Sequence, residues 1–163
     1  MPLAKPHPEE MARLGTCSER FRPMAFALYE AINQRCIGES CVPLVVFGAR
    51  SAQEQLTIWM EGRRLIANGA DIWSPQSWAV QDHAKIRTWK FPGFSAHQTG
   101  DACDIALIDG EGAARHWIAD RDPRWRSINQ AAAAAVGATW GGSFKSFFDA
   151  AHFQHPAWVE PKR

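Results

Sequence analysis

The stretch from residue 94 to residue 108 constrains the fold most, because it places an acid inside an apolar run. Its second half, residues 102–108, is otherwise apolar on both faces of an extended chain, which predicts a central strand of a sheet. The acid in this run is Asp104. An unpaired charge in such a place costs several kcal/mol or is neutralised. The fold must therefore bring a partner to Asp104.

Two histidines and a second acid are candidates for that partnership. His97 precedes Asp104 by seven positions, and Gly100 between them would let the backbone turn closely. Near the C-terminus, His152 follows Asp149 by three positions, so their side chains share a side if the turn between them is helical. We predict a metal site formed by His97, Asp104 and His152. The alternative is a structural histidine–aspartate pair without a metal.

The three ligand types indicate which metal chemistry to expect. Two imidazoles and one carboxylate, with the fourth coordination position open, are typical of catalytic rather than structural zinc. Zinc lowers the pKa of a bound water from about 15.7 towards about 7. Asp149 would take that proton and pass it to the leaving amine. The sequence thus predicts zinc-dependent hydrolysis with Asp149 as the base.

Two further residues are candidates for binding the substrate. Arg50 lies between an expected strand and an expected helix, a corner where side chains tend to point into a site. Its guanidinium suits a substrate carboxylate or a developing oxyanion, and the alternative is a surface salt bridge. Ser95, two residues before His97, would face the same side in an extended segment and could hydrogen-bond the substrate. The alternative for Ser95 is a turn or cap residue.

The other histidines are expected outside the metal site. His155 would lie on the opposite side from His152 in an extended segment, as an outer contact or an exposed residue. Three more lie in loop-like, proline-rich or charge-rich surroundings and are expected to be solvated: His7, His83 and His116.

The cysteines are expected to be free thiols that pack. Cys36 and Cys41 flank a plausible turn, so a disulfide across it is the alternative. Free thiols are favoured because no export signal is recognised at the start of the chain. Cys103 should point to the opposite face of the strand from Asp104.

The hydrophobic pattern predicts an α+β fold: a small, mostly antiparallel sheet with helices packed against it and the zinc site on the sheet. Helices are expected at 19–35, from 52 to about 62 with a Ser51–Glu54 capping box, at 124–136, and briefly at 9–14. Strands are expected at 42–47, 86–89, 102–108, 138–140 and 152–154, with a turn at 109–112. Residues 68–84 are expected to form a long loop. Its Trp73 and Trp78 either pack onto the core or stack on sugars or a partner.

Length and charge limit the classes of protein. The 163 residues suit a single catalytic domain, 1–163, with its core at about 20–158 after a proline-rich segment, 1–16. A net charge of +1 gives no argument for nucleic-acid binding. No run is long and apolar enough for a membrane span or a signal peptide, so we expect a protein made in the cytoplasm. A monomer is taken as the default oligomeric state. Action outside would need another exit route.

The combined motifs resemble those of the LAS-type zinc peptidases, which include D-alanyl-D-alanine carboxypeptidases, dipeptidases and phage L-alanyl-D-glutamate endopeptidases. The resemblance covers about residues 42–156 and rests on Gly48-x-Arg50-Ser51-x-x-x-Gln55, Gly62, Ser95-x-His97-x-x-Gly100-x-Ala102-x-Asp104-Ile105, Trp140-Gly141-Gly142 and Asp149-x-x-His152-Phe153. It implies that His97, Asp104 and His152 bind zinc. It further implies that Asp149 is the base and that Arg50 engages the substrate.

The acid at position 149 indicates a branch of this family. The carboxypeptidase and dipeptidase branches typically carry Glu there, whereas Asp149, with Phe153 after the histidine, is more similar to the endolysin branch. That branch cleaves the L-Ala–D-Glu bond of peptidoglycan stem peptides, which makes the stem peptide the expected partner and cell-wall lysis the expected role. The alternatives are a D-alanyl-D-alanine carboxypeptidase or dipeptidase, and a non-catalytic, zinc-containing wall-binding module. Asp101, an extra acid near the site, and Cys103 depart from the family pattern.

Overall fold

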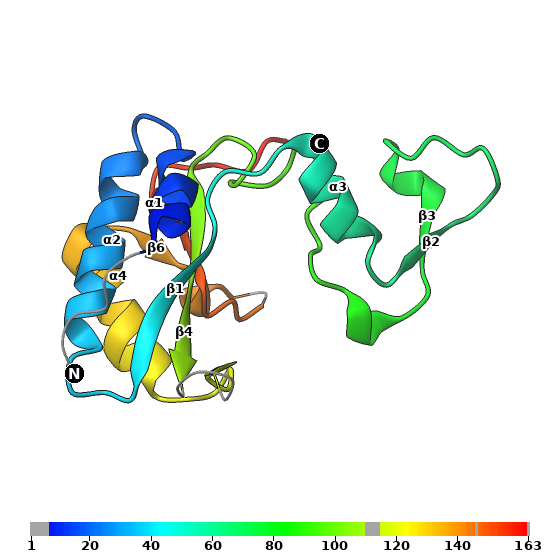
Figure 1. Cartoon of the computed structure of the whole chain (residues 1–163). Helices are drawn as coiled ribbons and strands as arrows, with labels where there is room; N and C mark the ends of the chain where they lie inside the picture. The colour runs from blue at the N-terminus through cyan, green and yellow to red at the C-terminus, as the bar shows by residue number, and fades with distance from the viewer. Residues whose placement is uncertain (1–6, 110–114, 146, 163) are drawn as a thin grey trace.

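A five-stranded antiparallel sheet forms the body of the protein (Figure 1). The computed structural model describes residues 7–109, 115–145 and 147–162. The strand order is β1-β4-β7-β6, and β5 pairs with β4. The strands of this sheet are β1 (Cys41–Phe47), β4 (Ala102–Asp109), β5 (His116–Trp117), β6 (Thr139–Trp140) and β7 (His152–Gln154). The predicted α+β architecture and the central position of β4 are confirmed, while the turn expected at 109–112 falls mainly outside the described residues.

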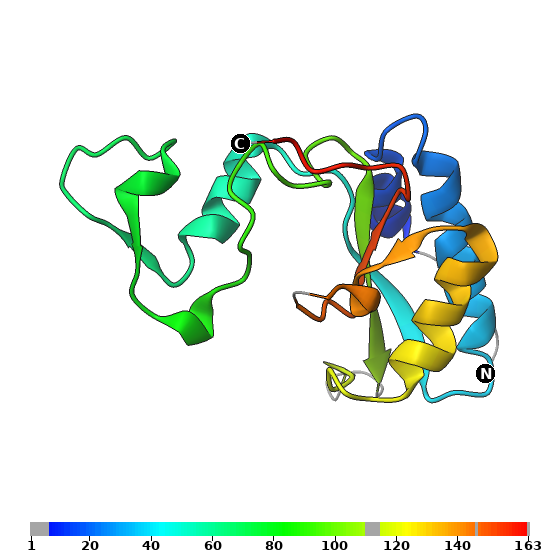
Figure 2. The same cartoon turned by 180° about the vertical axis from the view of Figure 1, so that it is seen from behind.

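Two helical segments cover one face of the sheet (Figure 2). Helix α2 (Arg22–Arg35) begins with Pro23 in its first turn and buries one side against the sheet. Helix α4 (Ala131–Val136) follows a π-helical turn (Trp125–Gln130) and ends at Gly137, which is left-handed at φ 77°. The helix predicted at 124–136 is therefore confirmed, with a π-helical first half. The main core lies between these helices and β1 and β4.

The core begins earlier in the chain than expected. Helix α1 (Pro8–Gly15) starts with His7, which closes a capping box with Glu10, so this exposed histidine has a local structural role. A Glu10 carboxylate oxygen also accepts a hydrogen bond from the backbone N–H of Val45 at 2.9 Å. Leu14 is fully buried. The lower core boundary expected near residue 20 is therefore wrong, because α1 is anchored to β1 and contributes to the core.

Residues 52–90 form an arm that extends away from the sheet (Figures 1 and 2). The arm contains α3 (Ala52–Met60), the short hairpin of β2 (Arg63–Leu65) and β3 (Trp78–Val80), and two 3-10 turns (Pro75–Ser77 and His83–Lys85). The Ser51–Glu54 capping box is present. The long loop expected at 68–84 is partly wrong, because β3 lies inside it. The strand expected at 86–89 is also wrong, because these residues line a pocket and pair with no strand.

The four thiols are free, as expected. The Cys36 and Cys41 sulfur atoms lie 3.6 Å apart, and Cys103 is fully buried in the core. Among the helices of the described residues, none is both long and apolar enough to cross a membrane.

Candidate metal centre

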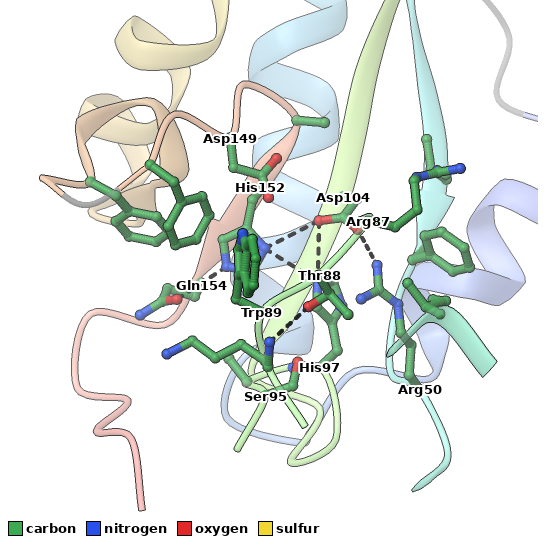
Figure 3. Close-up of a pocket in the computed structure, with 18 of the residues that line it drawn as sticks. Arg50, Arg87, Thr88, Trp89, Ser95, His97, Asp104, Asp149, His152 and Gln154 are labelled. Atoms are coloured by element: carbon green, nitrogen blue, oxygen red, sulfur yellow. Dashed lines mark hydrogen bonds and ion pairs between the residues drawn. The ribbon is translucent and has the colours of Figure 1, made fainter. Parts of the chain in front are cut away.

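Three side chains from distant parts of the chain converge on one point (Figure 3). One carboxylate oxygen of Asp104 lies 3.1 Å from Nε2 of His97 and 3.2 Å from Nδ1 of His152. The two ring nitrogens are 3.2 Å apart. The structure thus brings together the predicted ligands in a nearly equilateral triangle.

Strand pairing and one tight turn create this convergence. In the ladder between β4 and β7, Asp104 lies directly opposite His152, so the two side chains share a face of the sheet. His97 arrives from the segment before β4, which turns back at Gly100 with φ 74°. A side chain at position 100 would meet the backbone nitrogen of Ser18 at 2.6 Å. Gly100 is therefore needed both for its left-handed conformation and for its close contact with the chain.

The outer hydrogen bonds aim both imidazoles at the centre of the triangle. The Gly48 carbonyl can only accept, so Nδ1 of His97, 2.7 Å away, donates to it and Nε2 keeps its lone pair. On the other ring, Nε2 of His152 lies 3.1 Å from the side-chain oxygen of Gln154, which leaves the lone pair on Nδ1. Two lone pairs and a carboxylate oxygen therefore face one another. Only a cation or a shared proton makes such an arrangement stable.

The triangle fits a small tetrahedral ion. At the usual zinc–nitrogen distance of about 2.0–2.1 Å, ligand atoms at tetrahedral angles lie about 3.3–3.4 Å apart, close to the edges seen here. Among the described residues, no further histidine, cysteine, aspartate or glutamate belongs to this cluster. A metal held by these three residues would keep a coordination position for solvent or substrate.

Arg50 holds the outer oxygen of the central carboxylate. Its guanidinium donates to the second Asp104 oxygen at 2.5 Å, and its backbone N–H donates to the His97 carbonyl at 2.9 Å. Phe47 lies beneath the guanidinium at 4.2 Å. The Nε atom of Arg50 is buried without a partner among the described residues. Arg50 therefore lies in the wall of the site and orients the Asp104 side chain. The Arg50–Asp104 pair is largely buried, so the alternative of a surface salt bridge is wrong.

Burial and charge shift the pKa values of the site in opposite directions. Burial alone raises the pKa of Asp104, but His97 and His152 outweigh it and hold that pKa well below its usual value. Burial lowers the pKa of His97. For His152 the hydrogen bond and charge of Asp104 overcome burial, and its pKa is raised. The neutral imidazole of His97 and the ionised carboxylate of Asp104 are the forms that bind metal.

Asp149 lies beside the cluster without joining it. It is half-buried in the wall of the same pocket, and burial, followed by the charge of Asp104, raises its pKa. The backbone N–H of His152 donates to the Asp149 carbonyl at 3.4 Å, so a hydrogen-bonded turn, and not a helix, joins the two residues. An acid with a raised pKa next to a metal position is suited to accept a proton and to release it again.

Gly141 allows this turn to approach the sheet. A side chain at position 141 would meet the Asp149 carbonyl oxygen at 2.5 Å and Cβ of His152 at 2.9 Å. The Gly141 carbonyl also accepts a hydrogen bond from the Asp149 N–H at 3.3 Å. Any side chain here must therefore displace either the metal ligand or the adjacent acid.

We expect Gly141→Ala to destabilise the fold by about 1–3 kcal/mol and to weaken metal binding. The cause is overpacking against Asp149 and His152. Thermal unfolding and a metal titration measure the two effects. Gly15→Ala is the matched control, because a side chain there meets nothing within 4 Å. Equal metal affinity in the two variants would show that position 141 does not support the site.

The other candidates occupy different positions. Ser95 is buried in the pocket wall, and its hydroxyl accepts a hydrogen bond from the His97 N–H at 3.3 Å, which is a turn-type contact. Asp101 was expected as an extra acid near the site, and this expectation is wrong. Its carboxylate is bound by Arg20 and by the hydroxyls of two neighbours, and these contacts lower its pKa to about 2. His155 lies outside the cluster, where its backbone N–H donates to the backbone carbonyl of Asp101.

The sequence analysis did not predict how Gln154, Gly48 and Gly141 support the ligands, although both glycines belong to the quoted motifs. Gln154 has a signal that could have revealed it, since it lies two positions after His152 on the same face of a strand. Gly48 and Gly141 act through a carbonyl and through a missing side chain, respectively. Their roles follow from long-range proximity, which the local pattern of residues does not show.

A pocket of about 610 Å³ opens over the cluster of His97, Asp104 and His152. Its walls combine residues of the arm with residues of the sheet and the loop before β7. They include Phe47, Arg50, Ile58, Glu61, Arg87, Thr88, Trp89, Lys90, Ser95, Trp117, Phe144, Phe147, Phe148, Asp149, Gln154 and Trp158. This volume is larger than the two residues that flank a peptide bond require, so the pocket can take a longer ligand.

Comparisons with known proteins agree with the geometry. A family model described as D-alanyl-D-alanine carboxypeptidase matches residues 90–155, which contain His97, Asp104, Asp149 and His152. The crystal structure of the Serratia marcescens L-Ala D-Glu endopeptidase ChiX resembles this fold with a TM-score of 0.55 and 18% identity, covering 94% of this chain and 90% of that chain. No curated protein matches the sequence. The family model thus covers the three converging side chains and Asp149, and the likeness to the endopeptidase is a likeness in fold.

Proposed function

We propose that this protein is a zinc-dependent peptidoglycan hydrolase that cleaves the L-Ala–D-Glu bond of the stem peptide. One observation carries the proposal: three ligand atoms within 3.2 Å of one another lie in an open pocket, with the unligated Asp149 beside them. The specific bond is suggested by Asp149 in place of the usual Glu and by the similarity in fold to an L-Ala D-Glu endopeptidase. The protein would act as a monomeric, single catalytic domain on the cell wall, after release from the cytoplasm by a route other than a signal peptide.

In this proposal His97, Asp104 and His152 hold the zinc ion. A zinc ion bound there would supply Lewis acidity and would lower the pKa of a bound water. Asp149 accepts a proton from the attacking water and delivers it to the amine of D-Glu as the peptide bond breaks. The acid therefore begins the cycle ionised and ends it ionised, with one proton moved from water to the leaving group.

Arg50 and Ser95 act from the pocket wall. The Arg50 guanidinium keeps the Asp104 carboxylate turned so that one oxygen faces the two imidazoles. Its positive charge also lies where it can stabilise a developing oxyanion or a substrate carboxylate. Ser95 orients the His97 backbone through its hydroxyl and offers the same hydroxyl as a donor to the substrate.

A second candidate function uses the same machinery on another bond. The matching family model is described as a D-alanyl-D-alanine carboxypeptidase, which favours removal of the terminal D-alanine, or cleavage of the free dipeptide, as the rival activity. A non-catalytic, zinc-containing wall-binding module is a weaker candidate. Among the described residues no fourth ligand of the usual kinds completes the cluster, as a structural zinc site requires.

Mass spectrometry of a peptidoglycan digest tests the proposal and its rival together. We expect fragments with new L-alanine C-termini and new D-glutamate N-termini. Release of free D-alanine without these fragments would contradict the proposed bond and support the carboxypeptidase. Binding to the polymer without any cleavage, in the presence of zinc, would support the wall-binding module.

A further inference from the structure

Exposed aromatic side chains gather around the pocket. Single exposed apolar side chains are common on protein surfaces, but a group of them in one place commonly marks a binding site. Four of them line this pocket, from both of its sides: Trp89 in the arm, Trp117 on β5, and Phe147 and Phe148 in the loop before β7. The pocket therefore has apolar stacking surfaces on its rims, in addition to the polar cluster at its base.

A buried arginine holds the Trp89 ring in place. The Arg63 side chain stacks on the Trp59 ring at 3.6 Å and lies 5.1 Å from the Trp89 ring. Its guanidinium donates to the backbone carbonyls of Trp59 and Thr88 at 2.5 and 3.0 Å. Trp89 is nevertheless 54% exposed. The arm thus holds one side of this ring through a cation–π contact and leaves the rest of the ring facing solvent and the pocket.

The aromatic side chains of the loop before β7 pack against the candidate metal site. The Phe144 ring packs 5.6 Å from the ring of His152, and Phe147 packs on Phe144 at 5.4 Å. Trp117 pairs with Ile108 on β4, so it lies on the Asp104 face of the sheet, about 13 Å along the strand from Asp104. Polar groups of Arg87, Lys90 and Gln154 line the same pocket. Flat apolar faces beside hydrogen-bonding groups match the chemistry of a sugar ring.

We propose that Trp89 and the facing aromatic rim bind the saccharide to which the stem peptide is attached. This inference rests on the proposed function. In peptidoglycan, L-alanine is joined directly to the lactyl group of N-acetylmuramic acid. Cleavage after L-alanine therefore places a sugar only one residue, about 3.5 Å of extended chain, from the reacting bond. A pocket that cuts there must accommodate that sugar.

The same argument separates the two candidate reactions. The D-Ala–D-Ala bond lies three residues further along the stem, which adds about 10 Å of extended chain. A carboxypeptidase would not need a sugar site beside its metal. The stacking surfaces around this pocket therefore favour the L-Ala–D-Glu bond over the terminal one.

Two synthetic substrates test the inference: a muramyl tetrapeptide and the same tetrapeptide without the sugar. For Trp89→Ala, we expect the ratio of kcat/KM on the sugar-bearing substrate to kcat/KM on the bare peptide to fall about tenfold, mainly through KM. A factor of this size corresponds to uncovering roughly 50 Å² of apolar surface. Trp89→Phe keeps an aromatic face and should recover part of the ratio. Thermal unfolding of each variant reports any loss of folding.

Trp73→Ala is the matched control, because Trp73 is an exposed tryptophan of the same arm that does not line the pocket. Its substrate ratio should equal that of the unaltered protein. An unchanged ratio in Trp89→Ala, or an equal loss on both substrates, would overturn the saccharide site and leave the proposed function standing. Failure of the unaltered protein to cleave either substrate after L-alanine would overturn both.

Discussion

Replacing Asp149 by asparagine is expected to lower turnover by roughly 10²–10⁴-fold while the protein keeps its metal. Asparagine has nearly the same shape but cannot accept the proton of the attacking water. The metal remains because Asp149 is not one of the three converging ligands. Initial rates on purified peptidoglycan measure the loss, and metal analysis of the same sample measures the retention. Activity within a few-fold of the unaltered protein would show that another group is the base.

The pH dependence of the reaction provides a second check on Asp149. Its pKa is raised, chiefly by burial and then by the charge of Asp104, and only its ionised form can accept a proton. Activity should therefore fall as pH is lowered through the pKa of Asp149. Asp149→Asn should remove this acid limb from the residual activity. Asp120→Asn, which changes an exposed acid outside this pocket, should leave the profile unchanged.

Burial also predicts the effect of the same variant on stability. A folded-state pKa above the unfolded value means that the native state favours the protonated acid, so stability falls as pH rises through that pKa. At neutral pH the ionised Asp149 thus costs stability in the metal-free protein. Asp149→Asn should raise, or at least preserve, the melting temperature of that form. A clear decrease would indicate that the carboxylate has a structural role.

Removal of the metal is expected to abolish hydrolysis and to lower the melting temperature by about 5–10 °C. A ligand present at 100 times its Kd stabilises a protein by about 2.7 kcal/mol, and a domain of this size shifts by about 2–4 °C per kcal/mol. A chelator followed by added zinc should remove and then restore both properties. The physical reason is that two imidazole lone pairs and a carboxylate face each other at 3.1–3.2 Å, and a cation between them stabilises this arrangement.

Two histidine variants sharpen the metal experiment. His97→Ala should lose the metal, the activity and the thermal shift together, because it removes one corner of the triangle. His155→Ala should keep all three, because His155 lies outside the cluster. Cleavage that persists in chelator, or a melting temperature that does not respond to zinc, would contradict the metal-dependent mechanism.

Local patterns in the sequence were sufficient for much of the fold. The capping box at Ser51, the end of the helix at residue 136 and the apolar run around Asp104 each depend on neighbours within a few residues. These features were predicted correctly because their causes are local. The strand expected at 86–89 was wrong because that segment is held by contacts to the arm, such as the Arg63 bond to the Thr88 carbonyl, and not by a neighbouring strand.

In the candidate site, too, some features were predictable from the sequence and others depend on tertiary contacts. The ligand residues were recognisable because a buried acid needs partners and because few side chains bind metals. The short distances between the ligand atoms depend on the pairing of β4 and β7, which places His152 opposite Asp104. The engagement of Asp101 by Arg20 likewise depends on a contact across 81 positions of the chain.

The sequence by itself determined which residues could bind a metal, because that depends on the chemistry of each side chain. Only the tertiary structure decided how these residues are held. Arg50 binds Asp104, Gly48 and Gln154 set the tautomers of the two imidazoles, and Gly141 leaves room for the turn from Asp149 to His152. Each of these roles depends on a distance between residues far apart in the chain. Such distances are set by strand register and packing, which local sequence patterns do not encode.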